Sequence, residues 1–384
     1  MDIFLVIHNH YGRKSFFNEL NNVLRAISSK TTIPILTGIK IVVEDNQVVL
    51  TGSNADITIQ TTLSVTNGET ALTIEEPGAI VLPARFFSEI VKKLPDKEVT
   101  IEIRDGFQAK ISSGNAEFKI NGQDANNYPH LPEIENAATI AVPADLLRDV
   151  IEQTRIAVSK QESRPILTGI HVKFADNQLT AVATDSHRLA QRKVALPTGD
   201  QTYDVVIPGN SMTELARMIA DVKDDVQVQI AENQVLFQFG NALFYSRLLE
   251  GMYPETSRLI PETADTTIEL DAGKFLAAID RASLLSHQGH NNVVKLTIDP
   301  DNNVANISGD SADVGNVEEN ISADKIEGAK LEISFNPDYM SDALKSFGQT
   351  TVLISFTSPL RPFTLVPTED QENFVQLITP VRTF

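Results

Sequence analysis

Two hydrophobic periodicities alternate along this chain. The first places apolar side chains three to four residues apart, as on the buried face of a helix. It begins with a stripe made of Phe16, Phe17, Leu20, Val23, Leu24 and Ile27. A second stripe consists of Phe86, Phe87, Ile90, Val91 and Leu94. Comparable spacing predicts helices at residues 14–27, 84–94, 144–158, 211–220, 271–285 and 338–347, with Asp271 as an N-cap.

The second periodicity is the alternation of apolar and polar residues that marks a half-buried strand. It occurs in VTIEI, VQVQI and VVKLTID, and the opening segment MDIFLVIHNH is also predicted to be a strand. Runs of such strands follow the predicted helices. Runs of antiparallel strands with two helices in each unit favour an α+β fold of helices and β-meanders over βαβ winding.

The hexapeptide PILTGI occurs twice, at residues 34–39 and 165–170, and the tripeptide DNQ follows both copies. Tyr128 and Tyr253, each followed by Pro, continue the same order. Such a long period indicates duplicated domains rather than a short-repeat solenoid. A chain of 384 residues also exceeds the size of one hydrophobic core. We therefore expect three repeated domains, at residues 1–127, 128–254 and 255–384.

Composition restricts the environment and the chemistry. The chain has no Cys, which excludes disulfides and thiolate metal sites and fits a reducing cytoplasm. No apolar run is long enough to span a membrane, and no secretory signal is predicted. The net charge of −19 weighs against nucleic-acid binding. It does not exclude it, because a binding surface needs only local positive charge.

Basic residues recur at matching places in the repeats. The second helices of the three units align at Lys92, Arg217 and Lys345, and the first helices of two units align at Arg25 and Arg155. The loops that follow these first helices carry Lys30, Lys160 and Arg164. Such residues could face phosphates without reading bases. Alternatively, the residues three positions earlier on the second helices form local ion pairs with them; these are Glu89, Glu214 and Asp342.

The sequence offers little catalytic machinery. Asp185, Ser186 and His187 supply the residue types of a nucleophilic triad, but neighbours in a strand point to opposite faces. The histidine pairs HNH and HQGH lack the accompanying ligands of a metal site, and no phosphate-binding glycine motif is present. We therefore predict no enzyme, no metal and no cofactor. A hydrolase using these three residues is the alternative, and so is an interaction scaffold that never touches DNA.

Several motifs together resemble one family. They are RPILTG at 164–169, TDSHRLA at 184–190, the Tyr253-Pro254 pair, SFNPDYM at 334–340 and the tail LITPVRTF at 377–384. The chain resembles the β subunit of bacterial DNA polymerase III, the sliding clamps, in the style of low-GC Gram-positive bacteria. The resemblance implies a homodimeric ring that encircles duplex DNA without sequence preference. The eight basic residues above then become candidates for the DNA channel.

The resemblance also implies a hydrophobic groove that binds peptides of the replicative polymerase, the clamp loader, and repair and mismatch-repair proteins. One subsite comprises Leu167, Gly169, Thr184, His187, Arg188, Leu189, Pro254, Arg258 and Leu259. The other comprises Tyr339, Pro362, Leu377, Thr379, Pro380, Val381 and Arg382. From the residues alone, Leu167 and Leu377 are equally compatible with ordinary strand core.

For the contact between subunits, the resemblance points to Leu284 and Leu285. The repeat supports this independently, because Leu284 stands where the other units carry Arg25 and Arg155. An exposed basic site has therefore become apolar in the third unit.

Overall fold

The computed structural model describes residues 2–65, 71–95, 98–104, 106–135 and 137–383, so the terminal Met1 and Phe384 lie outside the described part. The chain divides into two compact units. Unit 1 comprises Met1–Asp145 and Glu214–Leu248. Unit 2 comprises Leu146–Thr213 and Leu249–Phe384.

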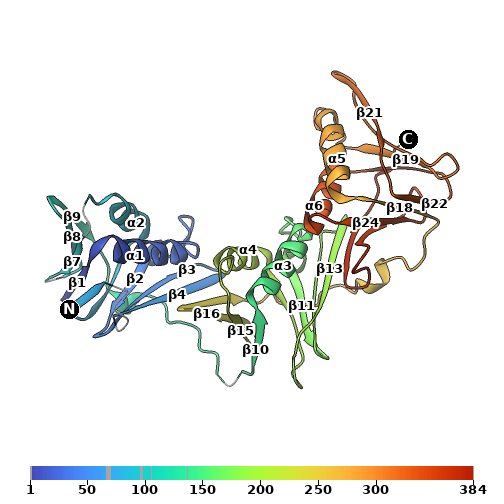
Figure 1. The fold of residues 1–384 in the computed structure, drawn as a ribbon. Coiled ribbons are helices and arrows are strands. Elements are labelled where there is room, and N and C mark those ends of the chain that lie inside the picture. The colour runs from blue at the N-terminus through green and yellow to red at the C-terminus, as the bar shows by residue number, and fades with distance from the viewer. Residues whose placement is uncertain (1, 66–70, 96–97, 105, 136, 384) are drawn as a thin grey trace. The chain divides into compact units, whose positions relative to one another are not determined.

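Unit 1 contains two antiparallel sheets (Figure 1). The five-stranded sheet has the order β5 (Leu72–Glu76), β1 (Ile3–Ile7), β7 (Val99–Ile103), β8 (Gln108–Ser113), β9 (Ala116–Asn121). The eight-stranded sheet has the order β10 (Thr139–Pro143), β15 (Asp225–Ile230), β16 (Gln234–Phe239), β17 (Ala242–Arg247), β4 (Ile57–Ser64), β3 (Gln47–Ser53), β2 (Gly38–Val43), β6 (Gly78–Pro83). Helices α1 (Asn9–Leu24) and α2 (Ala84–Lys93) pack against each other.

Unit 2 is built in the same way. Its nine-stranded sheet has the order β14 (Tyr203–Pro208), β11 (Gly169–Ala175), β12 (Gln178–Thr184), β13 (Arg188–Ala195), β26 (Phe374–Ile378), β25 (Phe363–Pro367), β24 (Thr351–Phe356), β18 (Thr266–Asp271), β22 (Lys325–Gly328). Its four-stranded sheet has the order β21 (Gly315–Ile321), β20 (Val304–Ser311), β19 (Val294–Asp299), β23 (Leu331–Phe335). Helices α5 (Ala272–Ser286) and α6 (Pro337–Phe347) pack together on this unit.

Helices α3 (Ala144–Thr154) and α4 (Gly209–Met218) carry the chain between the units. The sheets explain why the division cuts through the middle repeat. Strand β4 of the first repeat pairs with β17 of the second, and β13 of the second pairs with β26 of the third. Each large sheet therefore spans a junction between repeats. The predicted α+β fold of helices and antiparallel meanders is confirmed.

The helix predictions are right in place and partly wrong in extent. Helix α1 begins at Asn9, so the first strand ends at Ile7 instead of continuing through the opening segment. The helix predicted over 144–158 stops at Thr154 and becomes a 3₁₀ turn. The N-cap prediction is confirmed, because the Asp271 side chain accepts a hydrogen bond of 2.8 Å from the backbone N–H of Lys274.

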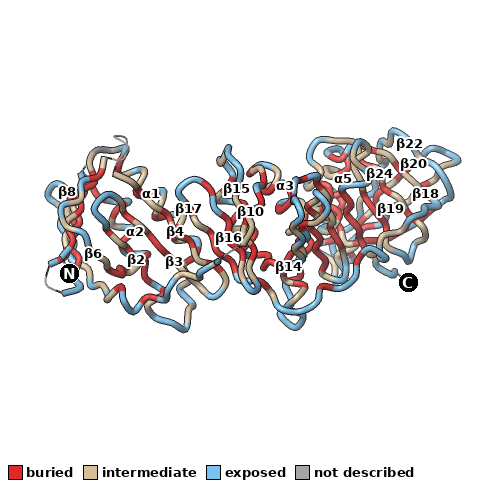
Figure 2. The backbone as a smooth tube through the Cα atoms, turned by 90° about the horizontal axis from the view of Figure 1, so that it is seen from below, coloured by how far each residue is buried: buried red, intermediate tan, exposed pale blue. Residues whose placement is uncertain are grey.

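One predicted core residue is on the wrong side. Phe86 is 73% exposed, whereas its neighbour Phe87 is fully buried. Successive residues of a helix point about 100° apart, so both rings of such a pair rarely face the same core. Elsewhere burial follows the predicted alternation, as along β4, and Figure 2 shows it as alternating buried and half-buried positions.

The repeated hexapeptide forms a 3₁₀ turn that leads into a strand, at Pro34–Thr37 and at Pro165–Thr168. The hydroxyl of each Thr donates to the carbonyl of the Pro three residues earlier. The following glycine permits a close approach of strands. A Cβ on Gly169 would lie 2.7 Å from the carbonyl oxygen of Ile207. Its sequence is thus fixed by turn geometry and by packing.

No helix in the described residues has the length and apolar character needed to cross a membrane.

Candidate functional site

The turn between β12 and β13 is held by its own side chains. The Asp185 carboxylate accepts hydrogen bonds from the backbone N–H groups of His187 at 2.9 Å and Arg188 at 3.0 Å. Ser186 adopts a left-handed conformation with φ of 77°, which is uncommon outside glycine. Its hydroxyl oxygen accepts a hydrogen bond from the Arg164 guanidinium at 2.9 Å. These contacts build a turn, and they do not link serine, histidine and aspartate as a nucleophilic triad does.

Arg188 is the structural centre of this region. Its guanidinium donates to Asp185 at 3.2 Å and to Asp342 of α6 at 2.7 Å. It also lies 4.4 Å from the ring centroid of Tyr339, within the range of a cation–π contact. Only 14% of the side chain is exposed, so the strand and the helix are joined by a largely desolvated cation.

The two predicted groove subsites meet at an apolar cluster. Leu189 on β13 lies opposite Leu377 on β26, and both pack with Leu167 and Tyr253. The Tyr253 hydroxyl accepts a hydrogen bond of 3.0 Å from the backbone N–H of Thr184, and burial raises the pKa of Tyr253 to about 12. The three leucines are almost fully buried, which ordinary strand core would also give. Leu259, beside them in sequence order, is 52% exposed.

A pocket of about 310 Å³ gathers further predicted groove residues. Those that line it are His187, Tyr339, Thr379, Pro380 and Val381. The His187 and Tyr339 rings stack with centroids 6.4 Å apart. Pro362 and Arg382 are not among its lining residues. Sequence reasoning missed residues 290–293 and Asn336, which also line the pocket, because no motif marks the loop after α5.

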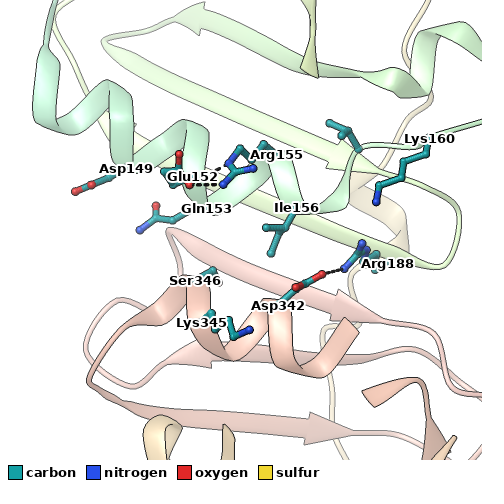
Figure 3. A pocket seen from close by; sticks show the side chains of 11 residues that line it. Asp149, Glu152, Gln153, Arg155, Ile156, Lys160, Arg188, Asp342, Lys345 and Ser346 are labelled. Atoms are coloured by element: carbon teal, nitrogen blue, oxygen red, sulfur yellow. Dashed lines mark hydrogen bonds and ion pairs between the residues drawn. The ribbon is translucent and has the colours of Figure 1, made fainter. Parts of the chain in front are cut away.

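A second pocket, of about 500 Å³, lies between the end of α3 and α6 (Figure 3). Four of its lining residues are basic: Arg155, Lys160, Arg188 and Lys345. Arg155 is engaged by Glu152 at 2.8 Å, and Arg188 by Asp342. Lys160 and Lys345 form no ion pair with any residue that the structure describes. The pocket therefore holds two ammonium groups that are available to an anion.

The remaining basic positions differ in the same way. Arg25 and Arg217 share the carboxylate of Glu214, at 3.4 Å and 2.8 Å. Within the described ranges, Lys30 and Lys92 have no carboxylate within ion-pair distance. The alternative of ion pairs three residues apart on the second helices is therefore right for Arg217 alone. Glu89 pairs with Lys93, and Asp342 pairs with Arg188.

The predicted subunit contact is an apolar side chain facing solvent. Leu284 on α5 is 69% exposed, and Leu285 is half-buried. The histidine pairs of the sequence have other contacts, because His8 bonds to Glu98 and Thr73 and His287 bonds to Asp338. Among the residues that the structure describes, no group of three or more His, Asp or Glu could hold a metal ion.

Repeated α+β units joined edge to edge through antiparallel strands, with unpaired cations on matching helices, define a protein of the DNA-clamp class. The family models of the DNA polymerase III beta subunit match its N-terminal domain to residues 9–132, its central domain to 141–255 and its C-terminal domain to 257–382. This chain belongs to the DNA polymerase III beta subunit family, and it is a DNA sliding clamp.

Relatives support this assignment along the whole chain. The beta sliding clamp of Bacillus subtilis is 52% identical over 368 residues, which cover 95% of this chain and 97% of that protein. A crystal structure of the Bacillus subtilis sliding clamp matches with a TM-score of 0.95 at 49% identity, covering all of both chains. A clamp from Bartonella birtlesii, solved bound to griselimycin, matches with a TM-score of 0.90 at 28% identity and covers all of both chains. The resemblance to clamps of low-GC Gram-positive bacteria is confirmed.

Proposed function

We propose that two copies of this chain close head to tail into a ring that encircles duplex DNA. The observation that carries the proposal is the repeated junction. Within the chain, β4 pairs with β17 and β13 pairs with β26. In the third repeat β21 holds the position of β4 and β13, and in the first repeat β9 holds the position of β17 and β26. Both β21 and β9 end their sheets, so each is free to join the other strand of a second copy.

Exposed apolar side chains support the same contact. At the junction inside unit 1, Arg25 of the first repeat reaches Glu214 of α4. Leu284 stands in the place of Arg25 on α5, and exposed Phe86 lies one turn before the position that matches Glu214 on α2. A junction between copies would thus replace a polar pair by an apolar one. We assign Leu284 and Leu285 to the dimer interface, with Phe86 of the other copy opposite.

The basic residues on the helices and following loops are proposed to face the DNA backbone. They are Arg25, Lys30, Lys92, Arg155, Lys160, Arg164, Arg217 and Lys345. Of these, Lys30, Lys92, Lys160 and Lys345 are the strongest candidates, because no described carboxylate neutralises them. Weak contacts to phosphates carry no sequence information and allow a ring to slide. A net charge of −19 is compatible with this, because the acidic residues elsewhere discourage nonspecific binding.

The groove around Leu167, Leu189 and Leu377 is proposed to dock short peptides of the replicative polymerase, the clamp loader, and repair and mismatch-repair proteins. Leu259 and the pocket beside Tyr339 provide exposed apolar surface next to that buried floor. Such an arrangement suits one or two anchoring side chains of an extended peptide. By analogy with the Bartonella clamp, griselimycin is expected to bind this groove.

The protein is proposed to act without catalysis, in the cytoplasm where replication takes place. Its domains are proposed to span residues 1–127, 128–254 and 255–384. These boundaries follow the sequence repeat, whereas the two compact units follow the shared sheets.

Retention on DNA of different topology tests the proposal. The protein is loaded onto nicked circular DNA by a bacterial clamp loader with ATP, and a restriction enzyme then linearises the DNA. We expect stable retention on the circle and rapid loss after cutting, because only a topological link is broken by free ends. Equal retention on circular and linear DNA would contradict encirclement, and absence from both would favour a scaffold that does not bind DNA.

A further inference from the structure

The groove region of unit 2 has a structural counterpart in unit 1. Leu167, Val206 and Tyr253 of the groove cluster correspond by the sequence repeat to Leu36, Val81 and Tyr128, which also form one buried cluster. The strand pairs correspond as well. Leu189 and Leu377 are opposite each other across β13 and β26, and Thr58 and Tyr245 are opposite each other across β4 and β17.

A pocket of about 720 Å³ opens at this counterpart. Leu236 and Tyr245, on adjacent strands β16 and β17, lie on one side, and residues 130–135 lie on the other. This segment follows the Tyr128-Pro129 pair, as the groove residues Arg258 and Leu259 follow the Tyr253-Pro254 pair. The pocket thus combines an apolar floor with a strand-like rim, which is the same construction as the groove.

The charges at the two places are opposite. The groove carries four basic residues, Arg164, His187, Arg188 and Arg258. The corresponding residues of the first repeat are Ile33, Asp56, Ile57 and Glu133. Glu133 and Glu135 line the pocket, are exposed, and form no ion pair with any residue in the described part of the chain. Lys40, the pocket's single lysine, lies 5.9 Å from the centroid of the Tyr128 ring.

We propose that the pocket lined by Leu236, Tyr245 and Glu133 is a second docking site, for a short extended peptide of a partner protein. Its ligand carries an apolar anchor next to a lysine or arginine. The apolar anchor is placed against Leu236 and Tyr245, and the cation is met by Glu133 and Glu135. Opposite charge makes this site reject the ligands of the groove and gives one clamp two classes of partner. The proposal rests on the proposed function insofar as the groove supplies the template for the comparison.

Fluorescence anisotropy on the full-length protein tests the proposal with two labelled probes, the hexapeptide GKLFKG and its acidic match GELFEG. The wild type is expected to bind the basic probe more tightly than the acidic one. The double variant Glu133→Lys/Glu135→Lys should lose at least about tenfold in affinity for the basic probe, because attraction becomes repulsion. Both residues are exposed, so the fold should be retained. The matched control is Arg258→Glu, the corresponding position of the groove, which should leave this affinity unchanged.

Three outcomes would overturn the second site: no binding of the basic probe to the wild type at millimolar concentration, equal binding by the double variant, or loss of binding in Arg258→Glu. Peptide-induced hydrogen-exchange protection of residues 130–135 is the expected location of binding, and protection confined to the groove would also overturn it. Griselimycin binding to the same preparations is measured separately. Its failure would count against the proposed groove alone.

Discussion

At the scale of single residues, several side chains here do work that their type does not announce. Tyr253 looks like one more aromatic residue before a proline. Its hydroxyl instead satisfies the buried N–H of Thr184, and its ring forms part of the groove cluster. Sequence identified the residue through the repeated Tyr-Pro pair. It could not identify the hydrogen bond, because Thr184 is far away along the chain.

Alkaline unfolding should reveal the buried Tyr253. Its pKa is raised to about 12 by burial, compared with about 10 in an unfolded chain. An acid with a raised pKa stabilises the fold below pH 10 and loses that contribution as the pH rises towards 12. At pH 11 the loss amounts to about 1.4 kcal/mol. Tyr253→Phe is expected to be less stable than wild type at pH 8, since Thr184 loses its acceptor.

Urea unfolding at pH 8 and pH 11 measures this difference. The stability gap between wild type and Tyr253→Phe should narrow at pH 11, because the variant has no phenol to ionise. A gap that stays constant between the two pH values would show that Tyr253 ionises equally easily in both states.

At the scale of elements, the hexapeptide PILTGI shows why a sequence can be duplicated so faithfully. Each copy makes a 3₁₀ turn closed by its threonine, buries its leucine, and ends on a glycine beside a neighbouring strand. All six positions are therefore constrained by turn or packing geometry. Helix α1 illustrates the opposite case. Its start at Asn9 has no side-chain cap, so nothing in the sequence marked the boundary.

The glycine requirement gives a direct test. Gly169→Ala would place a methyl group 2.7 Å from the carbonyl oxygen of Ile207 and from side chains of Val206 and Leu249. Separation of β11 from β14 should then cost about 1–3 kcal/mol in the free energy of unfolding. The matched control is Gly273→Ala, on exposed helix α5, where the nearest atom would be at 3.4 Å. That variant should be neutral or slightly stabilising.

The cationic pocket between α3 and α6 makes a second prediction at this scale. Lys160→Glu/Lys345→Glu should weaken binding of the dimer to a short DNA duplex. The dependence of log affinity on log salt should also become shallower by about two, one for each lost phosphate contact. Anisotropy titrations across salt concentrations measure both quantities. Lys173→Glu/Lys193→Glu changes the net charge equally on strands β11 and β13, and it should have little effect. Equal weakening by both pairs would mean that net charge alone matters.

At the scale of the whole molecule, the recurring junction between repeats is the organising feature. Two such junctions lie within the chain, and the strands that would form a third stand at sheet ends. The periodicity of the sequence was enough to predict repeated domains. The sharing of sheets between repeats was not predictable, because strand pairing across a junction depends on residues that are distant in sequence.

Leu284→Lys should separate the ring into single chains. A lysine at the proposed contact would bury a charge without a partner at each of the two interfaces. We expect the dimer dissociation constant to rise by at least about tenfold. Analytical ultracentrifugation over a concentration series measures it. Met252→Lys is the control, because Met252 is 91% exposed and lies outside the proposed interface. If Leu284→Lys and Met252→Lys dimerise as tightly as wild type, the interface lies elsewhere.

The sequence by itself determined the class of fold, the position of six helices, the threefold repeat and the family. Each follows from local periodicity or from motifs that are contiguous in the chain. Only the tertiary structure decided which cations are free. Arg217 is neutralised by its helical neighbour Glu214, whereas Lys345 is free because Asp342 turns to Arg188. It also decided that Leu189 and Leu377 meet in one cluster. Ion pairing and burial depend on what the folded chain brings within a few ångströms, and spacing along the sequence does not encode that distance.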